Sequence, residues 1–493
     1  MPLKTFLLAA ALIALARCAS RDEGEKLALR NCATCHAFPA PALLDKTTWR
    51  NDVLPEMAFR MGLDMSKLPG TDPDELSQVL HAIPSSPLVS EEEWKSIQEY
   101  YVRSAPDSLA KIVRHPPSPL QQFTTSTVVL PVSGHKHLTM VECDTNRNRI
   151  LVGTREGKLF VLNKSLQPLD SFRLPGPPSD VFFLADGTTL VSCMGVMDPN
   201  DQSKGSIIRI GASLNDPQVV IDSIKRPVNA VAADLNSDGM PDVLVSAFGN
   251  FTGDLSAYEK FSAGYRRHLI HSFPGTRKSV VRDFTGDGLP DIMALITQGD
   301  ERIALFTNRG GFKFSYQVLL RFPPVYGSSY FELVDFNNDG ALDILYTNGD
   351  NADYSSVLKP YHGIRIFLND GTNHFREDRF YPMYGASVAR ACDFDGDGDL
   401  DIAAISFFPD FKNHPDESFV YLRNDGNTFT PFKTPLAATS RWIAIEVLDI
   451  DDDGDQDLAL AALAFPTSVP EDLFQRWGNS GTSLLILRNN LKD

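Results

Sequence analysis

The sequence predicts a mainly β protein, a seven-bladed β-propeller with a small all-α domain at its N-terminus. Two observations predict this fold. An acidic segment of constant spacing recurs five times in the C-terminal part of the chain, each time between short apolar strands. The region before these repeats instead carries apolar residues at helical spacing. The 493 residues are 43% hydrophobic and include 33 Gly and 33 Pro, as expected for a folded, loop-rich chain.

The net charge of the chain argues against a nucleic-acid partner. The chain has 46 Lys+Arg against 63 Asp+Glu, a formal charge of −17. Proteins that hold nucleic acid through a basic surface have the opposite balance. We therefore expect no nucleic-acid partner.

Residues 1–18 have the form of an export signal. Lys4 precedes an apolar run over Phe6–Ala16, which is too short to span a bilayer and has the length of a secretory signal core. Residues 14–16 (Ala-Leu-Ala) offer an ordinary cleavage site, whereas the tetrapeptide ending at Cys18 resembles a bacterial lipobox, which would make Cys18 a lipid anchor. Both alternatives predict an exported protein, periplasmic or at the outer surface.

A C-x-x-C-H motif follows within Asn-Cys-Ala-Thr-Cys-His, residues 31–36. This spacing allows the thiolates of Cys32 and Cys35 to attach to the vinyl groups of haem while His36 reaches the iron. A zinc half-site is the alternative, but the second cysteine pair that it needs is missing. The motif therefore predicts one covalent haem c. Free buried thiols are expected at Cys143, Cys193 and Cys392.

Residues 22–106 resemble a small class I cytochrome c. The resemblance rests on the motif, on a helical pattern over residues 23–32 that leads into it, and on a second amphipathic helix. That helix begins at a capping box, Ser90–Glu93, and stops at Ala105-Pro106. It resembles the C-terminal cytochrome helix that packs on the first helix.

The resemblance implies a methionine as the sixth iron ligand. Met57 is the first choice because Leu54-Pro55 precedes it, and a proline commonly holds the ligand loop in this class; Met61 is second and Met65 third. The three methionines could equally fill a core, and His81 offers a bis-histidine alternative. A Met/His pair favours a relatively positive potential and leaves no open iron site for oxygen chemistry.

After a linker at residues 107–119, the five acidic segments share the pattern D-x-[DNT]-x-D-G-x-x-D. Their starts are 49, 52, 58 and 56 residues apart, which is a period typical of propeller blades. Each segment follows one apolar strand and precedes a second, and a third strand ends at an Asn-x-Gly hairpin in three of the repeats. This arrangement predicts four-stranded blades.

The spacing of oxygen-bearing side chains predicts a calcium site in each segment. Oxygens at relative positions 1, 3, 5 and 9, with a turn glycine at 6, resemble the first part of an EF-hand loop. A turn held by Asx hydrogen bonds would explain one segment, but not easily five in one register. The predicted ligands of about five Ca²⁺ ions are Asp234, Asn236, Asp238, Asp242, Asp283, Thr285, Asp287, Asp291, Asp335, Asn337, Asp339, Asp343, Asp393, Asp395, Asp397, Asp401, Asp449, Asp451, Asp453 and Asp457.

Residues 120–493 resemble the FG-GAP/VCBS repeat family of calcium-binding β-propellers, which includes the integrin α-subunit head. The resemblance rests on the five recurring loops and their strands. Two earlier blades, near residues 144–153 and 181–191, keep the strands but lose the acidic cage, so the total is seven. The last blade lacks a fourth strand, and Phe123–Leu130 should complete it and close the ring.

These features together predict an exported c-type cytochrome that exchanges electrons with a redox partner protein and uses the propeller as a docking or ligand-binding platform. Two alternatives stay open. One is a haem-linked dehydrogenase whose propeller binds the substrate, and the other is a surface adhesion or glycan-binding propeller. No nucleophile–base constellation or dinucleotide fingerprint favours an enzyme.

The propeller end opposite the acidic loops should gather a second set of residues. Connections between second and third strands, and between blades, lie at that end. Their cations and aromatic rings predict a site for an anionic or sugar-like ligand, or for the cytochrome domain itself. These residues are His135, His137, Arg226, Arg277, Lys278, Tyr326, Tyr330, Tyr354, Tyr361, Tyr384, Arg441, Trp442 and Trp477.

Overall fold

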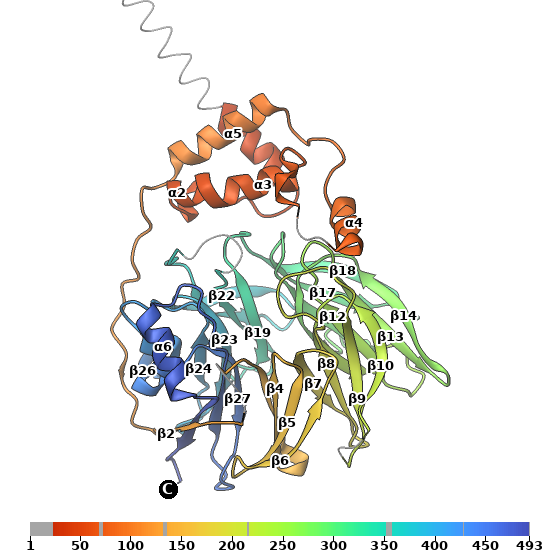
Figure 1. Ribbon diagram of the computed structural model, residues 1–493, viewed down its shortest axis with the longest axis vertical. Coiled ribbons are helices and arrows are strands. Elements are labelled where there is room, and N and C mark those ends of the chain that lie inside the picture. The colour runs from red at the N-terminus through yellow and green to blue at the C-terminus, as the bar shows by residue number, and fades with distance from the viewer. Residues whose placement is uncertain are drawn as a thin grey trace, which may run out of the picture.

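The computed structural model describes residues 23–68, 72–131, 136–213, 216–351, 357–426 and 428–492. Within them, a small helical domain covers one end of a β-propeller (Figure 1). The predicted export signal, with Cys18, lies outside the described residues. In the part of the chain that is described, no helix is both long and apolar enough to cross a membrane.

A close crossing of the first and last helices organises the helical domain. The helix at residues 23–32 meets α5 (Glu91–Ser104) at Gly24, where an added Cβ would lie 2.6 Å from the carbonyl oxygen of Ser96. Only a residue without a side chain allows this approach without a shift of the backbone. The last helix therefore packs on the first, as expected.

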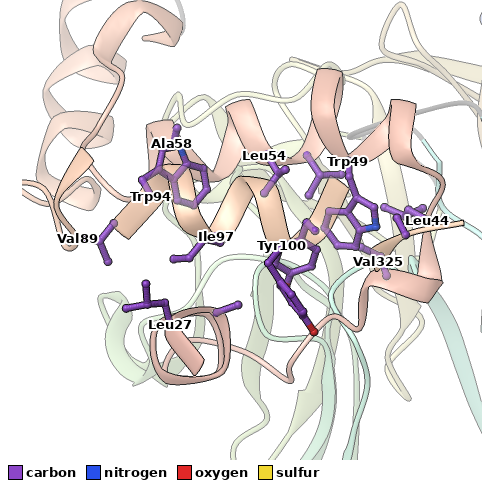
Figure 2. Close-up of a cluster of buried hydrophobic side chains, with 14 residues drawn as sticks. Leu27, Leu44, Trp49, Leu54, Ala58, Val89, Trp94, Ile97, Tyr100 and Val325 are labelled. Carbon is purple, nitrogen blue, oxygen red and sulfur yellow. The ribbon is translucent and has the colours of Figure 1, made fainter. Parts of the chain in front are cut away.

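The predicted capping box starts α5, since the backbone N–H groups of Ser90 and Glu93 each donate to the other's side chain. The buried side chains of α5 join an aromatic-rich core, in which Val325 of the propeller lies beside Leu44 and Trp49 (Figure 2). The two domains therefore share one core. The other helical elements are η1 (Pro41–Leu43), α2 (Lys46–Thr48), the π-helix η2 (Trp49–Val53), α3 (Leu54–Arg60), η3 (Met65–Lys67) and α4 (Pro73–Ala82).

The strands of the described residues form seven sheets, which confirms the predicted seven-bladed propeller. The first two blades lack the acidic loops. Blade one comprises β3 (Leu138–Asp144), β4 (Arg149–Thr154), β5 (Lys158–Asn163) and β6 (Pro168–Arg173), with η4 (Thr145–Arg147) after β3. Blade two comprises β7 (Pro178–Phe183), β8 (Thr189–Cys193), β9 (Gly205–Ile210) and β10 (Gln218–Ile224).

Five blades with acidic loops follow. Blade three comprises β11 (Pro227–Ala233), β12 (Asp242–Ala247), β13 (Asp254–Phe261) and β14 (Gly264–His271), and blade four β15 (Thr276–Arg282), β16 (Asp291–Ile296), β17 (Arg302–Asn308) and β18 (Phe314–Arg321). Blade five comprises β19 (Ser328–Val334), β20 (Asp343–Asn348), β21 (Gly363–Asn369) and β22 (Phe375–Pro382). Blade six contains β23 (Ala386–Cys392), β24 (Asp401–Ser406), β25 (Phe419–Asn424) and β26 (Phe429–Lys433), and blade seven β27 (Trp442–Leu448), β28 (Asp457–Ala462) and β29 (Leu484–Asn489). Helical turns in the last blades are η5 (Pro415–Ser418), η6 (Pro435–Thr439) and α6 (Glu471–Ser480).

The seventh blade is completed from the other end of the propeller sequence. β2 (Phe123–Val128) pairs antiparallel with β29, so the predicted closure of the ring is confirmed. The preceding residues 105–117 run along the outside of the propeller (Figure 1). β1 (Ser118–Pro119) then adds a short parallel strand to the edge of blade six, which the sequence did not predict. A proline fits this edge position because it has no N–H to offer a further strand.

The two ends of the propeller carry different loops. The acidic segments join the first and second strands of blades three to seven. They lie at the end away from the helical domain, where Lys492 at the C-terminus donates its backbone N–H to Asp455 at 3.2 Å (Figure 1). The helical domain covers the opposite end, at the connections between second and third strands and between blades.

Candidate functional site

A cavity of about 920 Å³ lies between the helical domain and the propeller. The helical domain lines it with Cys32, Cys35 and His36. The propeller lines it with residues from the first, innermost strand of every blade, which shows that the cavity continues into the axial channel. These residues include Glu142 of β3, Asp180 of β7, Asn229 of β11, Lys278 of β15, Tyr330 of β19, Arg390 of β23 and Ile445 of β27.

The C-x-x-C-H motif follows the first helix directly. Nδ1 of His36 lies 2.9 Å from the carbonyl oxygen of Ala37, so Nδ1–H donates and Nε2 keeps its lone pair. Burial lowers the pKa of His36 and keeps the imidazole neutral at pH 7. Both cysteines are free thiols, and burial raises the pKa of Cys32. A neutral imidazole with an available Nε2 is the form that ligates a metal.

Two of the predicted methionines face the same cavity. Met57 on α3 and Met61 directly after it are lining residues. Met65 is 42% exposed, and His81 is exposed with its Nδ1 2.6 Å from the carbonyl oxygen of Ser77. Among the described candidates for a second axial ligand, only Met57 and Met61 therefore share a cavity with His36.

Polar contacts hold the helical domain on the propeller at two well-separated points. Tyr361 donates its hydroxyl hydrogen to the carbonyl oxygen of Leu43 at 3.0 Å. On α4, the carboxylate of Glu75 accepts from the backbone N–H of Asp201 at 2.9 Å. Glu75 and Asp201 are both buried, so these bonds are shielded from water. The cavity thus lies between two joined domains.

We call the propeller part of the cavity, lined by Glu142, Asp180, Lys278, Tyr330 and Arg390, the axial pit. Arg390 is one of the lining residues. Its guanidinium contacts two carboxylates that are not among the described lining residues. The carboxylates are Glu332, 3.2 Å from Nε, and Glu446, 3.1 Å from Nη1.

Two further carboxylates enter the axial pit from neighbouring blades. Oδ2 of Asp180 accepts from Nδ2 of Asn229 at 3.0 Å and from the N–H of Ala230 at 2.9 Å. Glu142 has no hydrogen bond or ion pair with any residue that the structure describes. Burial is the main cause that raises the pKa of both groups, that of Asp180 to about 6.

The sequence analysis assigned no role to Glu142 or Asp180. A signal was present, because each is an acidic residue in a strand that also contributes apolar side chains to a core. Such residues in the innermost strand of a propeller face the axis, where every blade contributes a side chain.

Of the residues predicted to form a ligand site at this end of the propeller, some line the cavity and others are buried in the interior. Arg226, Arg277, Lys278 and Tyr330 line the cavity. The prediction is wrong for Arg441, which is fully buried with its guanidinium 4.6 Å from the ring centroid of Phe407. It is also wrong for two tryptophans that fill the interior, Trp442 and Trp477. Outside the described residues lie His135 and Tyr354.

The five acidic loops fold in one way. In each, the carboxylate at position 1 accepts from the N–H of the glycine at position 6, at 2.8 to 3.1 Å. The buried carboxylate at position 9 accepts from the N–H of position 2, at 2.7 to 3.2 Å. Carboxylate oxygens lie within 4.8 Å of one another in two sets: Asp393, Asp395 and Asp401, and Asp449, Asp451 and Asp453. All five loops thus present their oxygens in one register.

The pKa values of four position-9 carboxylates are raised, those of Asp242, Asp343, Asp401 and Asp457. Burial is the main cause, and it raises the pKa of Asp401 and of Asp457 to about 6. Nearby aspartates of the same loops add to the rise, through Asp395 at the first site and Asp451 at the second. These groups would be easier to ionise beside a cation.

Comparison with known proteins supports the repeat. Residues 283–346, which span the acidic loops of blades four and five, match the FG-GAP-like repeat family. The comparison with curated proteins finds no match. Among solved structures, the WD40 domain of Pan2 from Neurospora crassa is 12% identical with a TM-score of 0.46, covering 76% of this chain and 98% of that one. The β-propeller domain of Cps50 (Swd1) from Myceliophteria thermophila is 13% identical with a TM-score of 0.44, covering 69% and 96%. The chain is thus a seven-bladed β-propeller that contains an FG-GAP-like repeat.

Proposed function

We propose that this protein is an exported c-type cytochrome, whose single haem c lies between the helical domain and the propeller. The observation that carries the proposal is the shared cavity of Cys32, Cys35, His36 and Met57. The donor set suits the group, because it combines two free thiols at the attachment spacing with a neutral imidazole and a thioether. Bound haem supplies one-electron transfer between ferrous and ferric iron.

The chain's own residues hold and shield the site. Cys32 and Cys35 attach the group, and Ala37 orients the imidazole of His36 through Nδ1. Tyr101, whose hydroxyl donates to the carbonyl oxygen of Pro39 at 3.0 Å, fixes the segment that follows the motif. The propeller forms the opposite wall and excludes water from it. Cys35 is exposed, so a redox partner protein would approach at this edge.

Covalent attachment is tested on the full chain, produced in a host that matures c-type cytochromes. We expect a c-type pyridine haemochrome spectrum and loss of bound haem in the Cys32→Ser, Cys35→Ser double variant. Cys392→Ser is the matched control, because Cys392 is a free thiol outside the cavity, and it should keep the haem. A parent protein without the c-type spectrum would overturn the proposal.

The sixth ligand is tested separately. Met57→Ala should abolish the near-infrared band of a methionine–iron bond, whereas Met61→Ala should keep it. Both side chains line the cavity, so the pair is well matched in position. Loss of the band in Met61→Ala alone would assign the ligand to Met61 instead.

We further infer that the acidic loops bind calcium and that the ions stabilise the propeller. The shared register of the five loops supports this, because oxygens at positions 1, 3, 5 and 9 suit a hard cation that prefers oxygen ligands. The close carboxylates of blades six and seven support it further, because they repel one another unless a cation lies between them.

A further inference from the structure

We propose that the axial pit binds a small zwitterion, with its ammonium group at Glu142 and Asp180 and its carboxylate at Lys278 and Tyr330. The ligand class is an aliphatic amino acid small enough for a cavity of about 920 Å³. The site consists of propeller residues, so it does not depend on the haem. If the haem proposal holds as well, the ligand would lie in the same cavity as the iron.

The acidic side of the pit offers carboxylate oxygens that can accept further hydrogen bonds. Neither oxygen of Glu142 has a hydrogen bond or contact ion pair with the described residues. Oδ2 of Asp180 accepts two hydrogen bonds from the next blade, and the backbone N–H of Val181 also favours the ionised form of this carboxyl group. A primary ammonium group has three N–H donors, so it can bridge the two carboxylates. A buried carboxylate without such a partner is costly.

The opposite side of the pit carries an ammonium group that forms no contact ion pair with the described residues, and its charge acts on Glu142 and Asp180 only at longer range. Lys278 donates to the hydroxyl oxygen of Tyr330 at 2.6 Å and lies 3.8 Å from the centroid of that ring. Of the ion pairs within the described residues, none includes Lys278. The Tyr330 hydroxyl, which accepts from Lys278, keeps its own hydrogen for donation. A carboxylate would therefore find two donors here.

The two sides belong to different parts of the ring, with Glu142 and Asp180 on blades one and two and Lys278 and Tyr330 on blades four and five. A simple cation would satisfy the first side and be repelled by Lys278, while a simple anion would be repelled by Glu142. A metal ion also fits poorly, because the only sets of three metal-ligating side chains found among the described residues are those of the acidic loops. A zwitterion satisfies both sides.

The proposal is tested by isothermal titration calorimetry on the full chain in saturating calcium. The probes are β-alanine, γ-aminobutyrate and ε-aminocaproate, with butylammonium and butyrate as singly charged controls. We expect saturable binding of at least one zwitterion, and about tenfold or weaker binding of both controls, because each lacks one charged contact. Equal binding of butylammonium, or no binding of any zwitterion, would overturn the proposal.

Two variants locate the binding. Glu142→Gln and Lys278→Met should each weaken binding of the best zwitterion by about tenfold or more. Glu142→Gln replaces a carboxyl group that has no hydrogen-bond partner among the described residues by a neutral amide of the same size, so it should fold at least as stably as the parent. Glu377→Gln on the exposed outer strand β22 is the matched control and should leave affinity unchanged. Unchanged affinity in Glu142→Gln would place the ligand elsewhere and overturn the proposal. Haem content, read from the haemochrome spectrum, reports separately on the proposed function.

Discussion

The connection between the first and second strands contains an Asp–Arg ion pair in blade one and only carboxylates at the same positions in blade seven. In blade one, the first strand ends at Asp144. In blade seven, Asp449 directly follows the first strand. The first residue of the second strand is then Arg149 in blade one and Asp457 in blade seven. Nε of Arg149 donates to Asp144 at 2.9 Å, and both residues are buried. Blade seven has only carboxylates at these positions, and the cations of the chain contact its loop elsewhere, Lys164 at Asp452 and Nε of Arg488 3.7 Å from Asp451.

The comparison teaches that the propeller has two kinds of blade. Where the chain supplies its own guanidinium, the turn is complete in the protein alone. If the five acidic loops bind calcium as proposed, the stability of these blades should follow the calcium concentration.

The largest expected effect is that of chelation. Removal of calcium with EDTA should lower the melting temperature strongly, because each saturated site contributes about 2–3 kcal/mol to the free energy of unfolding. Five bound ions would change the formal charge from −17 to −17 + 10 = −7. Differential scanning fluorimetry with and without EDTA measures the effect. An unchanged melting temperature in protein that elemental analysis shows to be metal-free would contradict it.

A pair of variants sharpens the contrast between the blades. Arg149→Gln should destabilise the propeller by about 3 kcal/mol, because it leaves Asp144 buried and deprived of its best partner. The loss should be the same with calcium as with EDTA. Asp451→Asn should cost stability in calcium and little in EDTA, because its carboxylate is expected to act as a ligand. The two denaturation midpoints, each compared with the parent under both conditions, measure this difference.

The pH dependence should reverse when calcium is added. In metal-free protein the pKa values of Asp401 and Asp457 are raised to about 6, whereas the pKa of an aspartate in the unfolded chain is about 3.9. Between these values the folded chain holds protons that the unfolded chain has released. The free energy of unfolding should therefore fall as pH rises from about 4 to about 6.

With calcium bound, the same carboxylates must be ionised, and protons compete with the ion. Stability should then rise over the same pH range. Melting temperatures at pH 5 and pH 7, each in EDTA and in calcium, give the four values needed. Parallel trends in both conditions would show that Asp401 and Asp457 do not bind the ion.

The smallest expected effect concerns the junction of the domains. Glu75→Gln should weaken the contact of α4 with the propeller by about 1 kcal/mol, because a charge-assisted bond to the N–H of Asp201 becomes a neutral one. Proteolysis between the domains should become faster while the calcium-dependent melting stays the same. A change in the calcium response would mean that Glu75 acts on the blades as well.

The sequence predicted repeats well and long-range contacts poorly. The acidic loops, the seven blades and the closing strand Phe123–Leu130 follow from local patterns that recur or match. Glu142 and Asp180 were missed because their importance arises only when seven strands meet at one axis. Arg441 was predicted as a surface cation, since its aromatic cage comes from residues 30 or more positions away as well as from a nearby loop. The parallel strand β1 was missed because a two-residue segment carries no periodicity.

The closing strand β2 also constrains the order in which the two domains can fold. Phe123 pairs with Asn489, so the ring stays open until β29 has been synthesised and can pair with β2. Pairing across so long a stretch of chain is slow compared with local helix formation. The helical domain, whose first and last helices are near in sequence, can therefore assemble while the propeller is still open. In the proposed cytochrome, the two thiols of the C-x-x-C-H motif would be accessible for haem attachment during this interval, before the blades close.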